Sequence, residues 1–402
     1  MTVLTGIDLP PGSPGGSVEL LRDLYLADDR PIPANVFMLA DTGGPPWGTA
    51  SRPAASPAAG QPAGHPVEGT RPVVLDVHGK QVGGPGFWQY VDDLAKVIGL
   101  RFRPEDHHVV HLQHLAFGAT PALLRAFPDH PHIALVHGTD LLFAADHPTQ
   151  GQVLREAAAA AGVIVVPTAA MADLLCELAP VDPGRIVHVP WGVPDRLLTA
   201  VPRPARPEPG PSLRLLYAGR LSAEKGAERL IAAVAHLDGV ETAVAAPEAQ
   251  YRAMGERIDL TGVRYLGWLT RPRLWRAFSQ YDLLVVPSTR FEAFGLVAVE
   301  AQACGLPVLY QPVPGLAEVL GDTAVAVDLT DPRNLVDTVA WLRRDRSALA
   351  DLRAAGRRNA ARFPLSRTAR ELEHLSELAH PVGGDRPGQP RMTDDRSFLR
   401  LL

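Results

Sequence analysis

Short apolar runs alternate along the chain with longer segments in which apolar and polar positions follow a helical period. The runs are rich in Val, Ile and Leu, which is typical of buried strands in a parallel sheet. In the first half they occupy residues 2–7, 36–40, 73–77, 109–115, 133–136, 162–167 and 186–190. In the second half they occupy residues 213–217, 243–246, 263–266, 283–287, a run from Val308, and 324–327. This alternation predicts an α/β fold.

The helical segments and the spacers between them predict two domains. Helices are expected at residues 17–26, 169–178, 295–304, 315–320, 332–344, 346–363 and 367–379. A chain of 402 residues is too long for one ordinary core. We expect a first domain at 1–195, a Pro-rich linker at 196–212, a second domain at 213–366, a helix at 367–380 that returns to the first domain, and a tail at 381–402.

Composition narrows the class of protein. The chain is 46% hydrophobic and 21% charged, as in a soluble globular protein. A net charge of −5 predicts no nucleic-acid partner. No apolar run has the length that a bilayer span needs, and the N-terminus lacks the layout of a signal peptide, so we expect a cytoplasmic protein without membrane insertion. Cys176 and Cys304 are expected to be buried thiols in a reducing compartment.

Residues 42–70 are dominated by Pro, Ala, Gly and Ser. Such a segment has too little apolar surface to order itself, so it is expected to be a flexible surface loop. A lid over an acceptor is the alternative interpretation.

The most informative stretch is 285–308, VVPSTRFEAFGLVAVEAQACGLPV. A short strand is followed by a loop that carries Glu292, and then by a helix that opens at Gly295 and carries Glu300 in its second turn. A helix that starts beyond a parallel strand presents free N–H groups and a positive dipole end, which suit phosphate. Gly295 allows close approach of a ligand, and Glu300 is placed to accept hydrogen bonds from sugar hydroxyls.

A second motif, AGRLSAEKG, follows the strand at 213–217. Gly219 allows close approach at the strand end, while Arg220 and Lys225 place two cations in the turn before a helix. A guanidinium forks onto phosphate oxygens and an ammonium acts as a point charge. A solvated cation pair is the alternative. The pair Gly15-Gly16, ahead of the helix at 17–26, is a further candidate anion site.

Histidines gather near the strands of the first half. His107, His108, His111 and His114 surround the run at 109–115, but the alternation of a strand puts His111 and His114 on opposite faces and no Cys lies nearby. A zinc site is therefore not favoured, and His114 is expected at a strand end facing a cleft. His137 follows the run at 133–136 in the segment HGTDL.

The E-x7-E pattern in EAFGLVAVEAQACGLPV resembles the signature of retaining glycosyltransferases of family 4, which have the GT-B fold of two doubly wound, Rossmann-like domains facing across a cleft. The resemblance covers most of the chain. It implies that Glu300 holds the nucleotide ribose, that Arg220 and Lys225 hold the diphosphate, and that His137 lies against the donor sugar. It also implies that Glu292 and the backbone of Ala293, Phe294, Gly295 and Leu296 hold the sugar and diphosphate. The loop with Gly15 and Gly16 would close over the donor.

Three segments bear on details of this resemblance. Trp268 lies in a loop that lines the nucleotide base in the family, where its ring would either stack or simply pack. The segment Trp191-Gly192-Val193-Pro194 stands where the family usually shows Asn-Gly-Val-Asp, so Trp191 and Pro194 depart from the family pattern. Ala246-Pro247-Glu248 stands where the family commonly has a Gly-rich turn.

The implied reaction moves a sugar from a nucleotide diphosphate, UDP being favoured, to an acceptor hydroxyl with retention of configuration. The donor is a co-substrate, and we expect no cofactor and no metal ion. A small hydrophilic acceptor is expected, such as a natural-product aminocyclitol or sugar. A sugar-nucleotide epimerase of the same fold and a non-catalytic sugar-nucleotide binder are the alternatives; acceptor-dependent release of nucleoside diphosphate separates all three.

Overall fold

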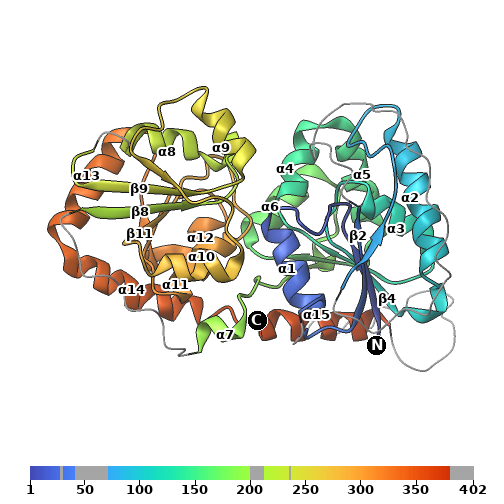
Figure 1. Ribbon diagram of the computed structural model, residues 1–402. Coiled ribbons are helices and arrows are strands. Elements are labelled where there is room, and N and C mark those ends of the chain that lie inside the picture. Colours follow the sequence, from blue (N-terminus) through green and yellow to red (C-terminus); the bar gives the residue numbers. More distant parts are fainter. Residues whose placement is uncertain (28–29, 41–70, 200–211, 235–236, 381–402) are drawn as a thin grey trace.

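The computed structural model describes residues 1–27, 30–40, 71–199, 212–234 and 237–380, and these residues form two α/β domains side by side (Figure 1). The expected loop at 42–70, most of the linker at 196–212 and the tail at 381–402 lie outside the described residues.

Within the described residues, the first domain is built on a seven-stranded parallel sheet. Its strands are β1 (Val3–Gly6), β2 (Ala34–Leu39), β3 (Val73–Leu75), β4 (Val109–Leu112), β5 (His132–Leu135), β6 (Val163–Val166) and β7 (Ile186–His188). They lie in the order β3-β2-β1-β4-β5-β6-β7. The helices are α1 (Gly16–Tyr25), α2 (Phe87–Arg101), α3 (Ala119–Ala126), α4 (Thr139–Asp146), α5 (Pro148–Ala160) and α6 (Ala169–Leu178), with 3-10 turns at Pro104–Asp106 and Pro183–Arg185.

The second domain repeats this plan around six parallel strands in its described part. They are β8 (Leu213–Ala218), β9 (Val240–Ala245), β10 (Val263–Tyr265), β11 (Leu283–Val286), β12 (Val308–Tyr310) and β13 (Val325–Ala326), in the order β10-β9-β8-β11-β12-β13. The helices are α8 (Ala227–Val234), α9 (Glu248–Gly255), α10 (Arg271–Phe278), α11 (Leu296–Ala303), α12 (Leu316–Leu320), α13 (Pro332–Arg344) and α14 (Arg346–Ala360), with 3-10 turns at Ala223–Lys225 and Gly321–Thr323. Helices α7 (Asp195–Leu198) and α15 (Leu365–Ala379) belong to the connections between the domains.

The strand orders fix where a ligand binds. In each sheet the first strand is third in the order, and the chain winds outward from it first to one edge and then to the other. The order therefore reverses between β1 and β4 and between β8 and β11. A crevice forms beyond the carboxyl ends of the strands at such a switch point. Two doubly wound domains of the expected kind are therefore confirmed, and each directs its switch point to the region between them.

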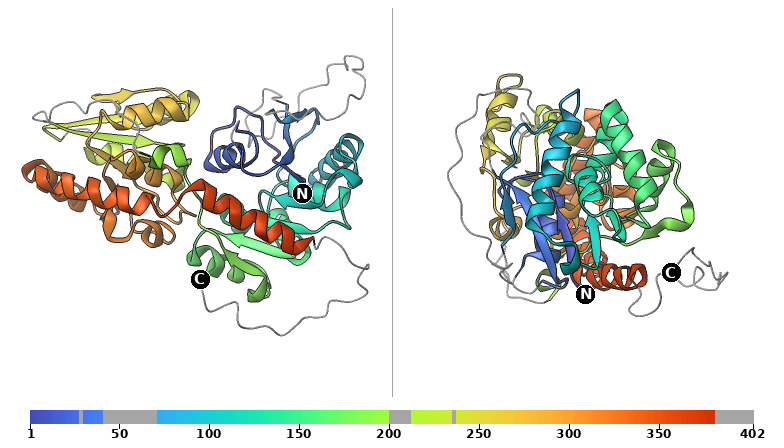
Figure 2. Two further views of the ribbon diagram at one scale, coloured as in Figure 1. Left: turned by 90° about the horizontal axis from the view of Figure 1, so that it is seen from below. Right: turned by 90° about the vertical axis from the view of Figure 1, so that its right-hand side faces the viewer.

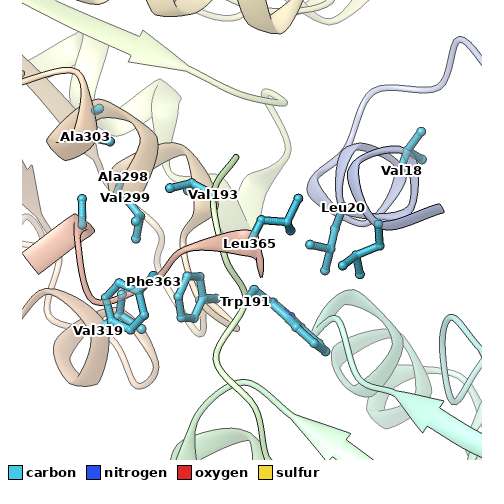
Figure 3. Packing of buried hydrophobic residues seen from close by; sticks show 14 of the residues in the cluster. Val18, Leu20, Trp191, Val193, Ala298, Val299, Ala303, Val319, Phe363 and Leu365 are labelled. Carbon is cyan, nitrogen blue, oxygen red and sulfur yellow. The ribbon is translucent and has the colours of Figure 1, made fainter. Parts of the chain in front are cut away.

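Side chains alternate between the two faces of each strand, so the first sheet contributes to two separate apolar cores. Val3 and Val109 point into one core, whereas their neighbours Leu4 and Val110 point into another on the opposite face of the sheet. The first core continues across the domain boundary, where Trp191 and Val193 pack near Phe363 (Figure 3). The domains thus share a continuous apolar core beneath the cleft.

The chain returns to the first domain at its last described helix. Val193 pairs with Pro364 where the two connecting segments meet, and α15 then runs along the first domain (Figure 2). The Oγ of Ser376 on α15 lies 2.8 Å from Nε2 of the buried His111 on β4, and the ring's Nδ1 lies 2.8 Å from the Tyr25 hydroxyl. This buried polar chain fastens α15 to the sheet and to α1.

Three predictions from the sequence need correction. The strand expected at 109–115 ends at Leu112, so His114 lies beyond the strand, although it does line the cleft as expected. The helix expected at 346–363 ends at Ala360. Cys176 is exposed, whereas Cys304 is buried. Helix α6 buries Met171 and Leu175, and the residue after Leu175 lies about 100° around the helix on the outer side.

Candidate active site

A cleft of about 600 Å³ lies at the carboxyl ends of both sheets. It is lined by every residue that the sequence singled out: Gly15, Gly16, His137, Gly219, Arg220, Lys225, Trp268, Glu292, Ala293, Phe294, Gly295, Leu296 and Glu300. The structure therefore brings the two motifs of the second domain together with the glycine pair and the histidine of the first. Their individual roles stay predictions.

The first carboxylate of the E-x7-E pattern is held by two donors. The Lys225 ammonium lies 2.5 Å from Oε2 of Glu292, and the Ser288 hydroxyl donates to the same oxygen at 2.9 Å. An ammonium has three N–H groups, so Lys225 keeps two for a phosphate. Ser288 was missed in the sequence, although its position directly beyond β11 is the signal that could have found it.

Two glycines allow this arrangement for packing reasons. Gly226 has φ +66°, and a Cβ there would lie 2.0 Å from the carbonyl oxygen of Pro287, so the turn after Lys225 sits directly against the loop of Glu292. Gly295 has φ +76° at the start of α11, and a Cβ there would lie 2.4 Å from Leu316. That Gly295 admits a ligand stays a prediction; the structure shows that Gly295 provides a left-handed turn packed on α12.

Arg220 lines the cleft beyond the end of β8. Its carbonyl oxygen accepts a hydrogen bond from the hydroxyl of Tyr217. Burial, with the nearby Glu292 carboxylate, raises the pKa of Tyr217, so this hydroxyl stays protonated and keeps donating. The turn that carries Arg220 is thus tied to the strand before it.

His137 lies beyond β5 among aromatic rings. Its ring stacks on Trp191 with centroids 5.6 Å apart and lies 4.9 Å from the ring of His114. Burial, with the neighbouring His114, lowers the pKa of His137 well below its ordinary value, so the imidazole is neutral near pH 7. Its Nε2 lies 3.3 Å from the amide oxygen of Gln113. Nε2 therefore carries the hydrogen, which leaves Nδ1 as an acceptor for a hydroxyl.

The segment after β4 also borders the cleft and is held by buried acceptors. Leu115 donates its N–H to Asp140 at 2.9 Å, and Phe117 donates its N–H to Gln150 at 2.6 Å. Gly118 donates its N–H to Asp8 at 3.0 Å. Phe117 has φ +71°, a strained value for a residue with a side chain.

A cation on this side of the cleft was missed in the sequence. Lys80 lies 3.7 Å from the Asp8 carboxylate, and both residues line the cleft. No pattern around Lys80 distinguishes it from a surface lysine, because it meets Asp8 only through the fold.

The second carboxylate, Glu300, is buried and has partners within the chain. Its Oε1 accepts hydrogen bonds from Nε and Nη2 of Arg271, and its Oε2 accepts one from the Trp275 indole at 2.9 Å. Arg271 was also missed, because a cation in the first turn of a helix carries no special signal in sequence. Trp268 lines the cleft and is 43% exposed. Trp268 is thus not a packed core residue, and stacking of its ring on a nucleotide base stays a prediction.

The described residues contain neither a candidate membrane span nor a candidate metal cluster. No helix there is both long and apolar enough to cross a bilayer. No group of three or more His, Cys, Asp or Glu side chains in the described ranges gathers closely enough to hold a metal ion.

Two doubly wound domains that face each other across a cleft, with cations and carboxylates at the strand ends, are the architecture of GT-B glycosyltransferases. The profile described as Glycosyl transferases group 1 matches residues 202–359, and the profile described as Glycosyltransferase Family 4 matches residues 53–197. D-inositol 3-phosphate glycosyltransferase 1 of Catenulispora acidiphila is 32% identical over 320 residues, which cover 72% of this chain and 76% of that protein. The chain therefore belongs to glycosyltransferase family 4 and is a glycosyl-transferring enzyme.

Other similar proteins agree with this assignment. Glycogen synthase of Mycobacterium tuberculosis is 31% identical over 279 residues, 64% of this chain and 63% of that protein. Sucrose-phosphate synthase of Thermosynechococcus elongatus superposes with a TM-score of 0.73 at 17% identity, covering 94% of this chain and 98% of that one. The Anabaena protein HepE, solved with UDP and glucose, superposes with a TM-score of 0.70 at 19% identity, covering 94% and 100%. At these identities the two solved structures show the fold alone.

Proposed function

We propose that this glycosyltransferase moves a sugar from a nucleoside diphosphate sugar, with UDP favoured, to a hydroxyl of a small hydrophilic acceptor, such as a natural-product cyclitol or sugar, with retention at the anomeric carbon. The observation that carries the proposal is the convergence of Arg220 and the Lys225–Glu292–Ser288 group on the cleft that His137 enters from the opposite domain. The structure of HepE with UDP and glucose supports the choice of nucleotide. The inositol phosphate glycosyltransferase supports a small polar acceptor.

The chemistry follows from where charge develops. As the bond to the sugar breaks, negative charge grows on the departing diphosphate, so fixed cations and helix N–H groups stabilise the transition state more than the ground state. Arg220, the two remaining N–H groups of Lys225 and the start of α11 at Gly295 are the groups assigned to this task. No step in this scheme requires a metal ion.

The other side of the cleft is assigned to the sugar and the acceptor. The neutral His137 offers Nδ1 to a sugar hydroxyl. Glu292, which pairs with Lys225, is assigned to the sugar–phosphate junction. The acceptor would enter from the first domain, between the segment after β4 and Lys80. Transfer on the face from which the diphosphate leaves preserves the configuration of the donor.

Mass spectrometry tests this proposal directly. Purified enzyme is incubated with UDP-, ADP- and GDP-sugars, with and without a panel of cyclitols and small sugars, and both the product and the released nucleoside diphosphate are quantified. We expect a glycosylated product with release that depends on the acceptor. Epimerised donor without release would identify an epimerase, and bound but unaltered donor would identify a non-catalytic binder.

A further inference from the structure

A buried group of charges joins the two domains beside the cleft. Arg271, the first residue of α10, donates from Nη1 to Asp23 on α1 of the first domain. Its Nε donates to Oε1 of Glu300 on α11 at 3.0 Å, and its Nη2 donates to the same oxygen. Trp275, one turn later on α10, donates to Oε2 of Glu300 at 2.9 Å. We call Asp23, Arg271, Trp275 and Glu300 the interdomain clasp.

The clasp is shielded from water. The exposed fraction of the side chain is 11% for Arg271, 10% for Asp23 and 5% for Glu300. Burial by itself lowers the pKa of Arg271, but Glu300 and Asp23 raise it overall, so the guanidinium stays charged. Breaking a buried ion pair is strongly destabilising because a charge is left without its partner. Since Asp23 and Arg271 belong to different domains, this stabilisation exists only while the domains stay together.

Further charges surround the clasp. Glu19 lies 3.9 Å from Arg271, and Arg196 on α7 stacks over the ring of Trp275 at 5.3 Å. Burial raises the pKa of both Glu19 and Asp23, against the influence of Arg271. Arg271 is thus the cation that faces carboxylates from both domains at this point, with Arg196 lying on the connecting segment.

The clasp also determines how Glu300 faces the cleft. A carboxylate offers about four lone-pair positions, and Oε1 already receives two donors from Arg271. Among the described residues, only the Trp275 indole donates to Oε2, so Oε2 is the oxygen with an acceptor position left for a ribose hydroxyl. Without the fork of Arg271 the carboxylate would be free to rotate away from this orientation.

Helix α1 connects the clasp to the opposite wall of the cleft. Gly15, Gly16 and Ser17 at its start line the cleft. Asp23 lies seven residues after Gly16, about 10 Å along the same helix. Fixing Asp23 therefore fixes the helix start that faces the ligand.

We propose that Arg271 is a positioning residue that orients Glu300 toward the ribose and, through Asp23, holds α1 of the first domain over the donor. The inference rests on the proposed function, in which Glu300 is the ribose carboxylate. It predicts separable effects on turnover and on nucleotide affinity for the two arms of Arg271, by which we mean the Nη1 contact with Asp23 and the Nε and Nη2 contacts with Glu300. Loss of the arm to Asp23 opens the cleft and leaves nucleotide affinity nearly intact, whereas loss of the arm to Glu300 weakens nucleotide binding.

Two variants separate the arms. Asp23→Asn removes the first-domain carboxylate that lies closest to Arg271 and keeps Arg271 on Glu300. We expect UDP affinity within about threefold of wild type but kcat/KM for transfer lower by about tenfold or more. Arg271→Lys keeps the charge but loses the planar guanidinium that holds Glu300, so here UDP affinity should fall by about tenfold in addition to the loss of turnover. If Arg271→Lys had wild-type affinity and turnover, charge balance alone would explain the cluster and the inference would fail.

The chain supplies a matched control and a labelling site. Arg290 and Asp146 form another ion pair between the domains at 3.2 Å, but their side chains are 59% and 54% exposed. Asp146→Asn should therefore leave affinity and turnover unchanged. Cys176 is exposed on α6, whereas Cys304 is buried and is not expected to react with a spin label. A second label is attached through Ala354→Cys, at an exposed position of α14, so that the two labels report the distance between the domains.

Pulsed dipolar measurements on these labels decide the inference without turnover. Without nucleotide, Asp23→Asn should add a population at longer distance that is absent from the parent and from Asp146→Asn. Identical distance distributions and turnover in Asp23→Asn and Asp146→Asn would overturn the clasp. If the wild type neither binds nucleoside diphosphates nor transfers sugar, the proposed function fails, while the distances still decide whether Asp23 holds the domains together.

Discussion

The Lys225 ammonium pairs with the Glu292 carboxylate in the structure, and in the proposed reaction it also contacts the diphosphate. Glu292 holds the ammonium at the cleft, and the departing diphosphate would recruit its remaining N–H groups. Replacing Lys225 or Arg220 by Ala should cost about 2–4 kcal/mol of transition-state stabilisation, as with lost oxyanion donors. Most of the loss should appear in kcat, because a ground-state phosphate recruits water instead. Steady-state kinetics on each variant give these values.

The control for these variants is an arginine outside the cleft. Arg252 pairs with Glu248 on the surface of α9, with 76% of its side chain exposed. Arg252→Ala should behave like wild type. Near wild-type kcat/KM in both Lys225→Ala and Arg220→Ala would remove the diphosphate from this end of the cleft.

Glu300 should act on binding and not on the chemical step, because the ribose lies away from the breaking bond. Glu300→Gln keeps one acceptor oxygen but turns an amide N–H toward either Arg271 or Trp275, both of which are donors. UDP affinity should fall about tenfold, within the range for a lost charged hydrogen bond. Titration calorimetry measures this directly, and an unchanged affinity would place the ribose elsewhere.

Helix α15 depends on the protonation of one histidine. Ser376 donates its hydroxyl to the carbonyl of Leu372, so its oxygen accepts from Nε2–H of His111, and Nδ1 accepts from Tyr25. Burial lowers the pKa of His111 from 6.5 to about 3. A group whose pKa is lower in the folded state contributes stability above its unfolded pKa and loses it as the pH falls, here from 6.5 toward 3.

This linkage predicts an acid-sensitive element. Between pH 6.5 and pH 5, the His111 contribution to the free energy of unfolding should fall by about 2 kcal/mol, and His111→Gln should lack that part of the pH dependence. Hydrogen exchange should show the amides of α15 losing protection first. Equal pH dependence of wild type and His111→Gln would show that His111 does not hold this helix.

At the scale of elements, the sequence was informative where periodicity was strong. The strand runs and the helices at 169–178 and 332–344 were predicted closely, because buried strands and amphipathic helices leave long regular patterns. Helices α2, α3, α4, α5, α9 and α10 were not predicted. They follow Gly- and Pro-containing turns and their mixed composition gives short, weak periods, so tertiary packing decides them.

The residues of the candidate site likewise fall into those that local sequence patterns predicted and those that they did not. Residues in glycine-rich motifs at strand ends were found, because turn chemistry and position mark them. Arg271, Lys80 and Asp8 were not, since each acquires a partner distant in sequence only when the chain folds. A charge that acts through such a contact leaves no local signal.

In the whole molecule, the proposed reaction takes place in the cleft between two domains that are joined by a shared apolar core and by the interdomain clasp. The diphosphate charge is assigned to Arg220, Lys225 and helix N–H groups, so transfer should proceed unchanged in excess EDTA. In the proposed mechanism the acceptor attacks from the face that the diphosphate leaves, so the product should keep the anomeric configuration of the donor.

Proton NMR of the product formed from an α-linked UDP-sugar in excess EDTA tests the proposed reaction. We expect a product whose anomeric coupling constant is that of an α linkage, formed at the same rate with and without the chelator. A β-linked product, or activity that is lost in EDTA and restored by Mn²⁺, would contradict it.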